Sequence, residues 1–395
     1  MGDDYLRLRR ALGDAPLPAA LVDLDALEAN VDRIAGAARS LGKPLRMASK
    51  SVRSPDLMSA IFDRARGAVC GLMTYSAAET LWLAQQGFRD LLLAYPTLRG
   101  APLLAEANRL ATAAAAVDCE EQVAAFEQAA GRAQVRVPLV IDVDVSYRPL
   151  GSMVHLGVRR SPLRAPAEVV ALARRIANSP SLGFRGVLAY EAQIAGLPDV
   201  APGQPVRTAA LRAMKARSRA DVLAARAAIA AALRDAGLPP ALFNGGGTGS
   251  LASSPDEPAL TEVTAGSGFL ASHLFDGLDG LPLRPALFFA VEATRRPAPQ
   301  MTTCHGGGLI ASGAPGPDRL PLPSLPEGLS LLPLEGAGEV QTPLRGPQVE
   351  LGAPVFFRPA KAGEPAERFD SYLLVRGDAV VGRARTYRGM GQCFG

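Results

Sequence analysis

The chain has 395 residues, of which 48% are hydrophobic and 20% are charged, a composition that suits one or two folded domains and excludes extensive disorder. The 42 basic and 38 acidic residues leave a formal net charge of +4, with no run of Lys or Arg, so we expect no nucleic-acid partner. No stretch of about 18 apolar residues and no apolar signal segment occurs, so we expect no membrane partner and a cytoplasmic location.

Short apolar segments alternate with helical segments from about Ala15 to Asp276. Pro18–Asp23 has the composition of a strand, and Leu24–Leu41 carries apolar residues at helical spacing. Further strands are expected at residues 45–49, 68–73, 90–96, 113–118, 137–144, 184–190, 241–246 and 260–265, and further helices at 54–65, 76–86, 120–130, 165–177 and 206–236. Continuous apolar strands that alternate with helices are typical of a parallel sheet. The pattern predicts an α/β fold with a (β/α)8 TIM barrel over residues 15–276, and a doubly wound open sheet is the alternative.

The composition and the hydrophobic pattern of the sequence change after Asp276. Pro and Gly become frequent, helical periodicity disappears, and segments of β type appear at residues 286–294, 339–344, 353–359 and 369–377. We therefore expect a smaller, mostly β domain over residues 277–395, on which residues 1–14 could also pack.

Lys50 is the first candidate for chemistry. It follows the apolar segment Leu45–Ser49, which places it at the C-terminal end of an early strand. Barrel enzymes assemble their sites on that face, and a lysine held away from bulk water there can present an amine for imine formation. An ordinary surface lysine is the alternative.

A glycine-rich segment after a late strand is the second candidate. Asn244–Ser250 reads Asn-Gly-Gly-Gly-Thr-Gly-Ser, so main-chain N–H groups can approach an anion without obstruction, and Thr248 and Ser250 add hydroxyl groups. Late loops of barrels commonly hold phosphate. The segment Ala265–Gly268, after the next strand, could supply a second wall of the same site. A tight turn is the alternative for both.

Polar residues follow two further strands. Asp142 and Asp144 end one strand, and Arg148 and Arg160 come later in the same loop. An arginine in this position can bond a cofactor ring, and a structural salt bridge is the equal alternative.

Tyr190 and Glu191 end another strand, so Glu191 is a candidate acid or base.

Together these segments resemble a known family. Lys50 after LRMAS, the late FNGGGTGS loop and the EVTAGS segment occur in the order found in D-threonine aldolases and D-serine dehydratases. The opening LPAALVDLDALEANVDRIA and the later TCHGGG and EGAGEVQTPL extend the resemblance over nearly the whole chain. It is closest to bacterial proteins described as amino acid deaminase/aldolase. The resemblance implies a pyridoxal 5′-phosphate (PLP) enzyme of the alanine racemase fold (fold type III), with an N-terminal barrel and a C-terminal β domain.

The resemblance also implies roles for individual residues. Lys50 matches the lysine that carries PLP as a Schiff base. Arg160, or alternatively Arg148, matches an arginine near the phenolic oxygen of the cofactor. Tyr190 and Glu191 match a strand end that faces the cofactor. The residues that match the phosphate-binding segments are Gly246, Gly247, Thr248, Gly266 and Ser267.

The sequence departs from the family at two positions, one in the metal-binding segment and one where the aldolases have a histidine. Metal-dependent D-threonine aldolases carry metal ligands in a C-terminal segment of the type Pro-x-His-x-Cys/Asp, whereas residues 359–364 here read Pro-Ala-Lys-Ala-Gly-Glu. Lys361 stands in place of the metal histidine, and a protonated lysine is not a metal ligand. The aldolases also have a histidine where this chain has Gln193. We expect no metal site, and we hypothesise that the Lys361 ammonium bonds the β-hydroxyl or carboxylate of the substrate.

The expected function follows from the resemblance. We expect a PLP-dependent lyase that acts on a D-amino acid with a β-hydroxyl group, by retro-aldol cleavage or by deamination, with Lys50, Tyr190, Glu191 and Lys361 as the catalytic candidates. A racemase and a non-catalytic PLP-binding protein are the alternatives. The resemblance further implies a homodimer with a small-molecule amino acid as its substrate.

Overall fold

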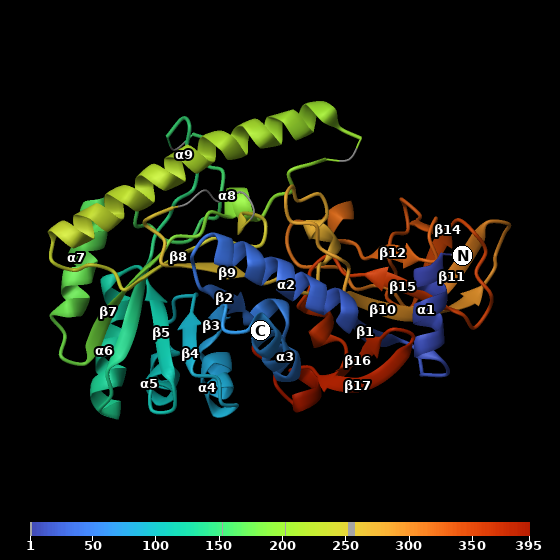
Figure 1. Cartoon of the computed structure of the whole chain (residues 1–395), viewed down its shortest axis with the longest axis horizontal. Helices are drawn as coiled ribbons and strands as arrows, with labels where there is room; N and C mark the ends of the chain where they lie inside the picture. Colours follow the sequence, from blue (N-terminus) through green and yellow to red (C-terminus); the bar gives the residue numbers. More distant parts are fainter. Residues whose placement is uncertain (1, 152, 202, 252–256) are drawn as a thin grey trace.

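Eight parallel strands close into a barrel in the computed structural model, which describes residues 2–151, 153–201, 203–251 and 257–395 (Figure 1). The barrel strands are β2 (Leu45–Ala48), β3 (Val69–Thr74), β4 (Asp90–Leu93), β5 (Thr112–Val117), β6 (Val137–Asp142), β7 (Leu182–Leu188), β8 (Leu242–Gly245) and β9 (Glu262–Ala265). The barrel closes because β2 pairs with β9, with Leu45 opposite Val263. The prediction of a (β/α)8 barrel is confirmed, and the doubly wound alternative is excluded.

Helices surround the barrel, and side-chain caps mark where several of them begin. They are α2 (Leu24–Ser40), α3 (Pro55–Ala65), α4 (Ala77–Gln85), α5 (Ala101–Ala107), α6 (Glu120–Ala133), α7 (Pro166–Ala177), α8 (Ala192–Ala195) and α9 (Pro205–Asp235). The Ser54 hydroxyl accepts a hydrogen bond from the N–H of Leu57, and Ser76 caps α4 in the same way. The sequence analysis missed α5, because its seven residues are too few to show helical periodicity.

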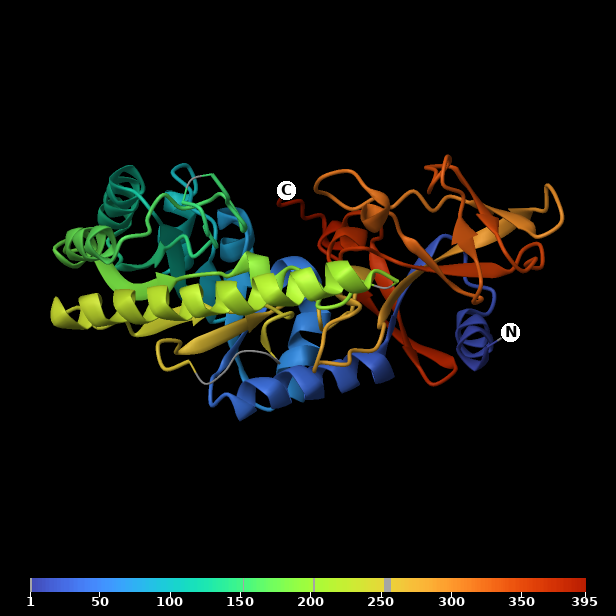
Figure 2. The ribbon, with the colours of Figure 1, turned by 90° about the horizontal axis from the view of Figure 1, so that it is seen from above.

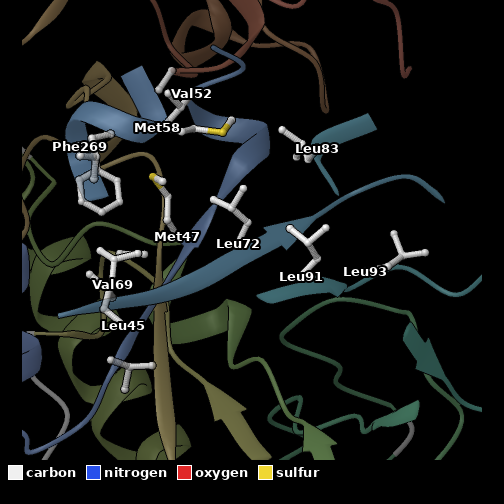
Figure 3. Close-up of a cluster of buried hydrophobic side chains, with 14 of the residues drawn as sticks. Leu45, Met47, Val52, Met58, Val69, Leu72, Leu83, Leu91, Leu93 and Phe269 are labelled. Atoms are coloured by element: carbon white, nitrogen blue, oxygen red, sulfur yellow. The ribbon is translucent and has the colours of Figure 1, made fainter. Parts of the chain in front are cut away.

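The barrel has apolar side chains on both faces of its strands. Leu92 and Ala114 pack with their neighbours in the interior of the barrel. Met47, Leu72 and Leu91 point outward, where they meet residues of the surrounding segments such as Met58 (Figure 3). Strands buried on both faces appear in the sequence as continuous apolar runs, which is why the sequence predicted them well.

A second, mostly antiparallel sheet of nine strands lies beside the barrel (Figures 1 and 2). Eight of its strands come from the C-terminal region: β10 (Leu287–Arg295), β11 (Met301–His305), β12 (Leu322–Leu325), β13 (Ser330–Leu331), β14 (Gln341–Arg345), β15 (Pro354–Arg358), β16 (Ser371–Arg376) and β17 (Ala379–Arg385). The prediction of a mostly β second domain is confirmed.

The ninth strand corrects the sequence analysis. The segment Pro18–Asp23 was expected to open the barrel, but β1 (Ala19–Asp23) lies in the second sheet, antiparallel to β10 and parallel to β16. Its residues from 20 to 23 are buried, so its apolar composition suits either sheet and does not identify the partner strands. The barrel strands therefore begin at Leu45, and the domain limits 15–276 and 277–395 stay a prediction.

Two helices at the edges complete the fold. α1 (Asp3–Leu12) packs Tyr5, Leu8 and Leu12 on the second sheet, where the Tyr5 ring lies edge-on to Phe356. α9 is 31 residues long and lies along the barrel, with its N-terminal end nearer the second sheet (Figures 1 and 2). Of the helices in the described ranges, none is both long and apolar enough to cross a membrane.

Candidate active site

Lys50 lies at the C-terminal end of the barrel, on a single 3-10 turn (Ser49–Ser51) that follows β2. Its Nζ donates a hydrogen bond of 2.7 Å to the hydroxyl of Tyr95. It also lines a cavity of about 840 Å³ between the barrel and the second sheet. Tyr190, Ser267 and Lys361 line the same cavity, so four of the residues predicted from the sequence meet there.

Tyr95 is a site residue that the sequence analysis missed. Burial raises the pKa of its phenol, but the Lys50 ammonium and the Arg160 guanidinium outweigh burial, and the pKa lies below the usual value of 10.0. Tyr95 ends the run Leu93-Ala94-Tyr95 after β4, and Tyr190 ends the same tripeptide after β7. The repeated Leu-Ala-Tyr at the ends of two strands was a signal in the sequence that could have identified Tyr95.

Arg160 lies beside both tyrosines. Its Cζ is 5.3 Å from the centroid of the Tyr95 ring and 5.9 Å from that of Tyr190, which are cation–π distances. Arg148, the alternative from the sequence, forms an ion pair with the Asp144 carboxylate instead. The structure therefore places Arg160 beside Tyr95, the residue that also contacts Lys50. Arg148 instead forms a salt bridge, which was the alternative interpretation for an arginine of this loop.

Asp142 is a buried carboxyl group close to Arg160 and Tyr190 in a small cavity. Burial raises its pKa to about 7, although the positive charge of Arg160 opposes this shift. Burial also raises the pKa of Tyr190 to about 12, so this phenol remains protonated at neutral pH. Near neutrality, Asp142 can therefore either hold or release a proton.

The two glycine-rich segments form adjoining loops after β8 and β9. The Thr248 hydroxyl accepts hydrogen bonds of 3.4 Å and 3.2 Å from the N–H groups of Gly266 and Gly268, which ties the loops together. The Ser267 and Ser51 hydroxyls lie 3.2 Å apart, so the second loop also contacts the turn that carries Lys50.

Small residues are required where these loops meet their neighbours. A Cβ on Gly266 would lie 2.7 Å from the Ser51 hydroxyl, and a Cβ on Gly247 would lie 3.2 Å from the Tyr190 ring. Gly246 has a φ of +87°, which also favours glycine. Within the described ranges, the main-chain N–H groups of Thr248, Gly249 and Ser267 donate no hydrogen bond. Free N–H groups on glycine-rich loops beside a lysine are a suitable set of donors for the phosphate of PLP.

Glu191 is buried beneath the first of these loops. Its carboxylate pairs with Arg226 and accepts hydrogen bonds from the N–H of Gly246 at 3.0 Å and the hydroxyl of Ser250 at 2.8 Å. Burial alone would raise the pKa of Glu191, but Arg226 and these donors lower it. This placement favours a role in holding the loop over a role as acid or base, and Arg226, from the middle of α9, was not foreseen.

Lys361 reaches the cavity from the second sheet. It follows β15, and its Nζ donates a hydrogen bond of 2.6 Å to the Ser312 hydroxyl and lies 3.4 Å from the Glu364 carboxylate. Gln193, which stands where the resemblance implies a histidine, is buried and donates to the carbonyl of Val145 at 2.9 Å. In the part of the chain that the structure describes, no group of three or more His, Cys, Asp or Glu side chains is placed to hold a metal ion.

Comparison with known proteins gives relatives in sequence. A family model described as alanine racemase, N-terminal domain, matches residues 22–270. D-threonine aldolase of Arthrobacter sp is 26% identical over 297 residues, which cover 73% of this chain and 71% of the relative. 3-hydroxy-D-aspartate aldolase of Paracoccus denitrificans is 25% identical over 253 residues, and the match spans only 59% of its length.

Solved structures share the fold. D-threonine aldolase from Filomicrobium marinum aligns with a TM-score of 0.79 at 22% identity, over 95% of this chain and 96% of that structure. D-threo-3-hydroxyaspartate dehydratase from Delftia sp. HT23 aligns with a TM-score of 0.74 at 18% identity, over 94% and 98% of the two chains. These structures confirm the fold, and the family model with the sequence relatives confirms the family resemblance noted in the sequence.

Proposed function

The chain belongs to the alanine racemase N-terminal domain family, and from that premise we propose that it is a PLP-dependent lyase of β-hydroxy D-amino acids. The reaction is retro-aldol cleavage or deamination. The names of the relatives, D-threonine aldolase and 3-hydroxy-D-aspartate aldolase, support this class of substrate. The observation that carries the proposal is the 2.7 Å hydrogen bond between Lys50 and Tyr95, beside two glycine-rich loops with free N–H groups.

The residues that would hold PLP come from four barrel strands. Lys50, after β2, would form the covalent link. The N–H groups of Thr248, Gly249 and Ser267, after β8 and β9, would bind the phosphate. Arg160, in the loop after β6, is the arginine suited to the phenolic oxygen. Bound PLP supplies an electron sink for the carbanion that develops at the α-carbon of the substrate.

Tyr95, beside Lys50, and Asp142, beside Arg160, can move protons. Tyr95 accepts a hydrogen bond from the Lys50 ammonium and has a lowered pKa, so it can take the proton that Lys50 must lose to react as an amine. Asp142, with a pKa of about 7, can exchange a proton near neutrality beside Arg160. Tyr190 remains protonated, so it acts as a hydrogen-bond donor in this scheme.

Lys361, which lines the same cavity as Lys50, would bind the substrate. Its ammonium is held by Ser312 and Glu364, which fixes its position but leaves the side chain 37% exposed on the cavity wall. There it can donate to the β-hydroxyl or to a carboxylate of the substrate. In retro-aldol cleavage, such a donor stabilises the negative charge on the oxygen that becomes the aldehyde.

A panel of substrates tests the proposal and separates the reactions. D-threonine, D-serine and D-3-hydroxyaspartate are incubated with the protein and PLP, and the products are identified by mass spectrometry. Aldol cleavage gives glycine and an aldehyde, whereas deamination gives ammonia and a 2-oxo acid. Either product set supports the lyase. The opposite enantiomer as the sole product would support a racemase, and no product from any substrate would support a PLP-binding protein without catalytic activity.

The same resemblance supports a homodimer in the cytoplasm. Proteins of the alanine racemase fold form dimers in which the β domain of one subunit lies near the barrel of the other, an analogy at the level of fold. Sedimentation equilibrium of the purified protein tests this proposal. A mass near twice 41.1 kDa is expected, and a monomer at all concentrations would contradict it.

A further inference from the structure

A second hollow, of about 700 Å³, lies at the other end of the barrel from Lys50. Each of its lining residues belongs to the first part of a barrel strand or to the turn just before one. The lining residues are Asn108, Arg109, Leu110, Ala111, Thr112, Arg136, Pro138, Gly183, Phe184, Arg185 and Ala241. The hollow is therefore at the N-terminal mouth of the barrel, a face that the proposed chemistry does not use.

The lining of the hollow is positively charged. It contains three arginines, Arg109, Arg136 and Arg185, and no carboxylate. Both Arg109 and Arg136 are exposed, and within the described residues neither forms an ion pair. Two guanidinium groups without a carboxylate partner therefore face one hollow.

Main-chain hydrogen bonds fix both free arginines in position. Arg109 Nη2 donates to the carbonyl of Ala133 at 2.8 Å, and Arg136 Nε donates to the carbonyl of Leu182 at 2.9 Å. Each arginine is anchored through one nitrogen, and its other N–H groups remain for a ligand.

Arg185 joins the hollow to the interior of the barrel. Its Nη2 donates to both oxygens of Asp90, at 3.2 Å and 3.1 Å, and Asp90 is also paired with the buried Arg46 at 3.2 Å. Arg46 in turn pairs with Glu262. Because Asp90 serves two arginines, and Arg185 Nη1 is buried without a hydrogen-bond partner, the positive charge of Arg185 is only partly compensated.

We propose that the N-terminal mouth of the barrel is a binding site for a small oxyanion, a phosphate or carboxylate group of a metabolite. Guanidinium groups bind such oxyanions through paired N–H donors, and anchored side chains lose little freedom when they do so. Arg109 and Arg136 provide the donors, and Arg185 adds positive charge at the base of the hollow. The site is separate from the PLP site and does not depend on the proposed reaction.

Isothermal titration calorimetry of the protein saturated with PLP tests the proposal. Inorganic phosphate and malonate are titrated separately at constant ionic strength, with chloride as the balancing ion. The stronger of the two binders identifies whether a phosphate or a carboxylate is preferred. The variants are R109Q, R136Q and the double variant, in which glutamine keeps the length and polarity of the side chain.

The expected result is a Kd at least tenfold higher in the double variant than in the wild type, because each substitution removes charge-assisted hydrogen bonds to the anion. R39Q is the matched control, because Arg39 also donates to a main-chain carbonyl, at 2.9 Å, but lies outside the hollow. Its Kd should equal that of the wild type. Equal affinity in the double variant and wild type would overturn the proposal, since phosphate would then occupy another site such as the Gly246–Ser250 loop. Failure of both anions to bind would also overturn it.

Discussion

Gly363 lies directly against the main-chain carbonyl of Lys50, so closely that a Cβ on Gly363 would be 1.8 Å from the carbonyl oxygen. The same oxygen accepts a hydrogen bond of 3.1 Å from Arg53 Nε. A segment of the second sheet thus supports the turn that carries the proposed Schiff-base lysine. Lys361 lies two residues before Gly363, so this contact also brings the Lys361 ammonium to the cavity.

Gly363→Ala should disturb the Lys50 turn. The backbone at Gly363 (φ −86°, ψ −21°) is acceptable for alanine, so the whole effect comes from overlap with the Lys50 carbonyl. We expect the free energy of unfolding, measured by chemical denaturation, to fall by about 3 kcal/mol. We also expect a weaker affinity for PLP, measured by titration. Gly382→Ala is the control, because a Cβ there would meet only a Leu374 methyl group at 3.8 Å. Equal stability of the two variants would refute the contact.

Tyr95→Phe should separate proton transfer from PLP binding. Loss of the hydroxyl removes the acceptor for the Lys50 ammonium, and we expect kcat to fall about 100-fold while PLP still attaches to Lys50. In the wild type, the phenolate is the form that accepts a proton, so kcat should rise with pH through the pKa of Tyr95, below 10.0. The variant should lack this rise. Tyr147→Phe is a control from a loop residue, and an unchanged pH profile in Tyr95→Phe would refute the assignment.

Arg160→Gln and Arg148→Gln together identify the arginine that contacts PLP. Arg160 lies beside Tyr95 and Tyr190, whereas Arg148 is paired with Asp144. We expect the Kd for PLP, from fluorescence titration, to weaken about tenfold in Arg160→Gln and to change less than about twofold in Arg148→Gln. The reverse order would assign the contact to Arg148.

Lys361→Ala, in protein treated with a chelator, tests the role of the ammonium in substrate binding. Loss of a charge-assisted hydrogen bond should lower kcat/KM by about 10- to 100-fold, with PLP binding unchanged. Lys361→Arg keeps the charge and should restore part of the activity. Unchanged turnover in Lys361→Ala would remove Lys361 from the mechanism.

The sequence predicted the barrel well because its strands are continuous apolar runs. The strand ends carried the site residues, so the order of Lys50, Arg160, Tyr190 and the two glycine loops along the chain was enough to place them on one face. These residues meet because parallel strands of a barrel share their C-terminal end.

Contacts between segments far apart in the chain could not be predicted from the sequence pattern. β1 is apolar in the manner of a barrel strand, and only its pairing with β10 and β16 shows that it belongs to the second sheet. Glu191 looked like an acid or base because its partner Arg226 lies 35 residues later, on another element. A local pattern does not reveal such a partner.

The measurement that tests the central claim most directly is reduction of the PLP-treated protein with borohydride, followed by mass spectrometry of its peptides. We predict an absorbance band that borohydride removes, a covalent PLP adduct on Lys50, and neither signal in Lys50→Ala. A protein that stays colourless with PLP, or an adduct on another lysine while Lys50→Ala keeps the band, would contradict the account.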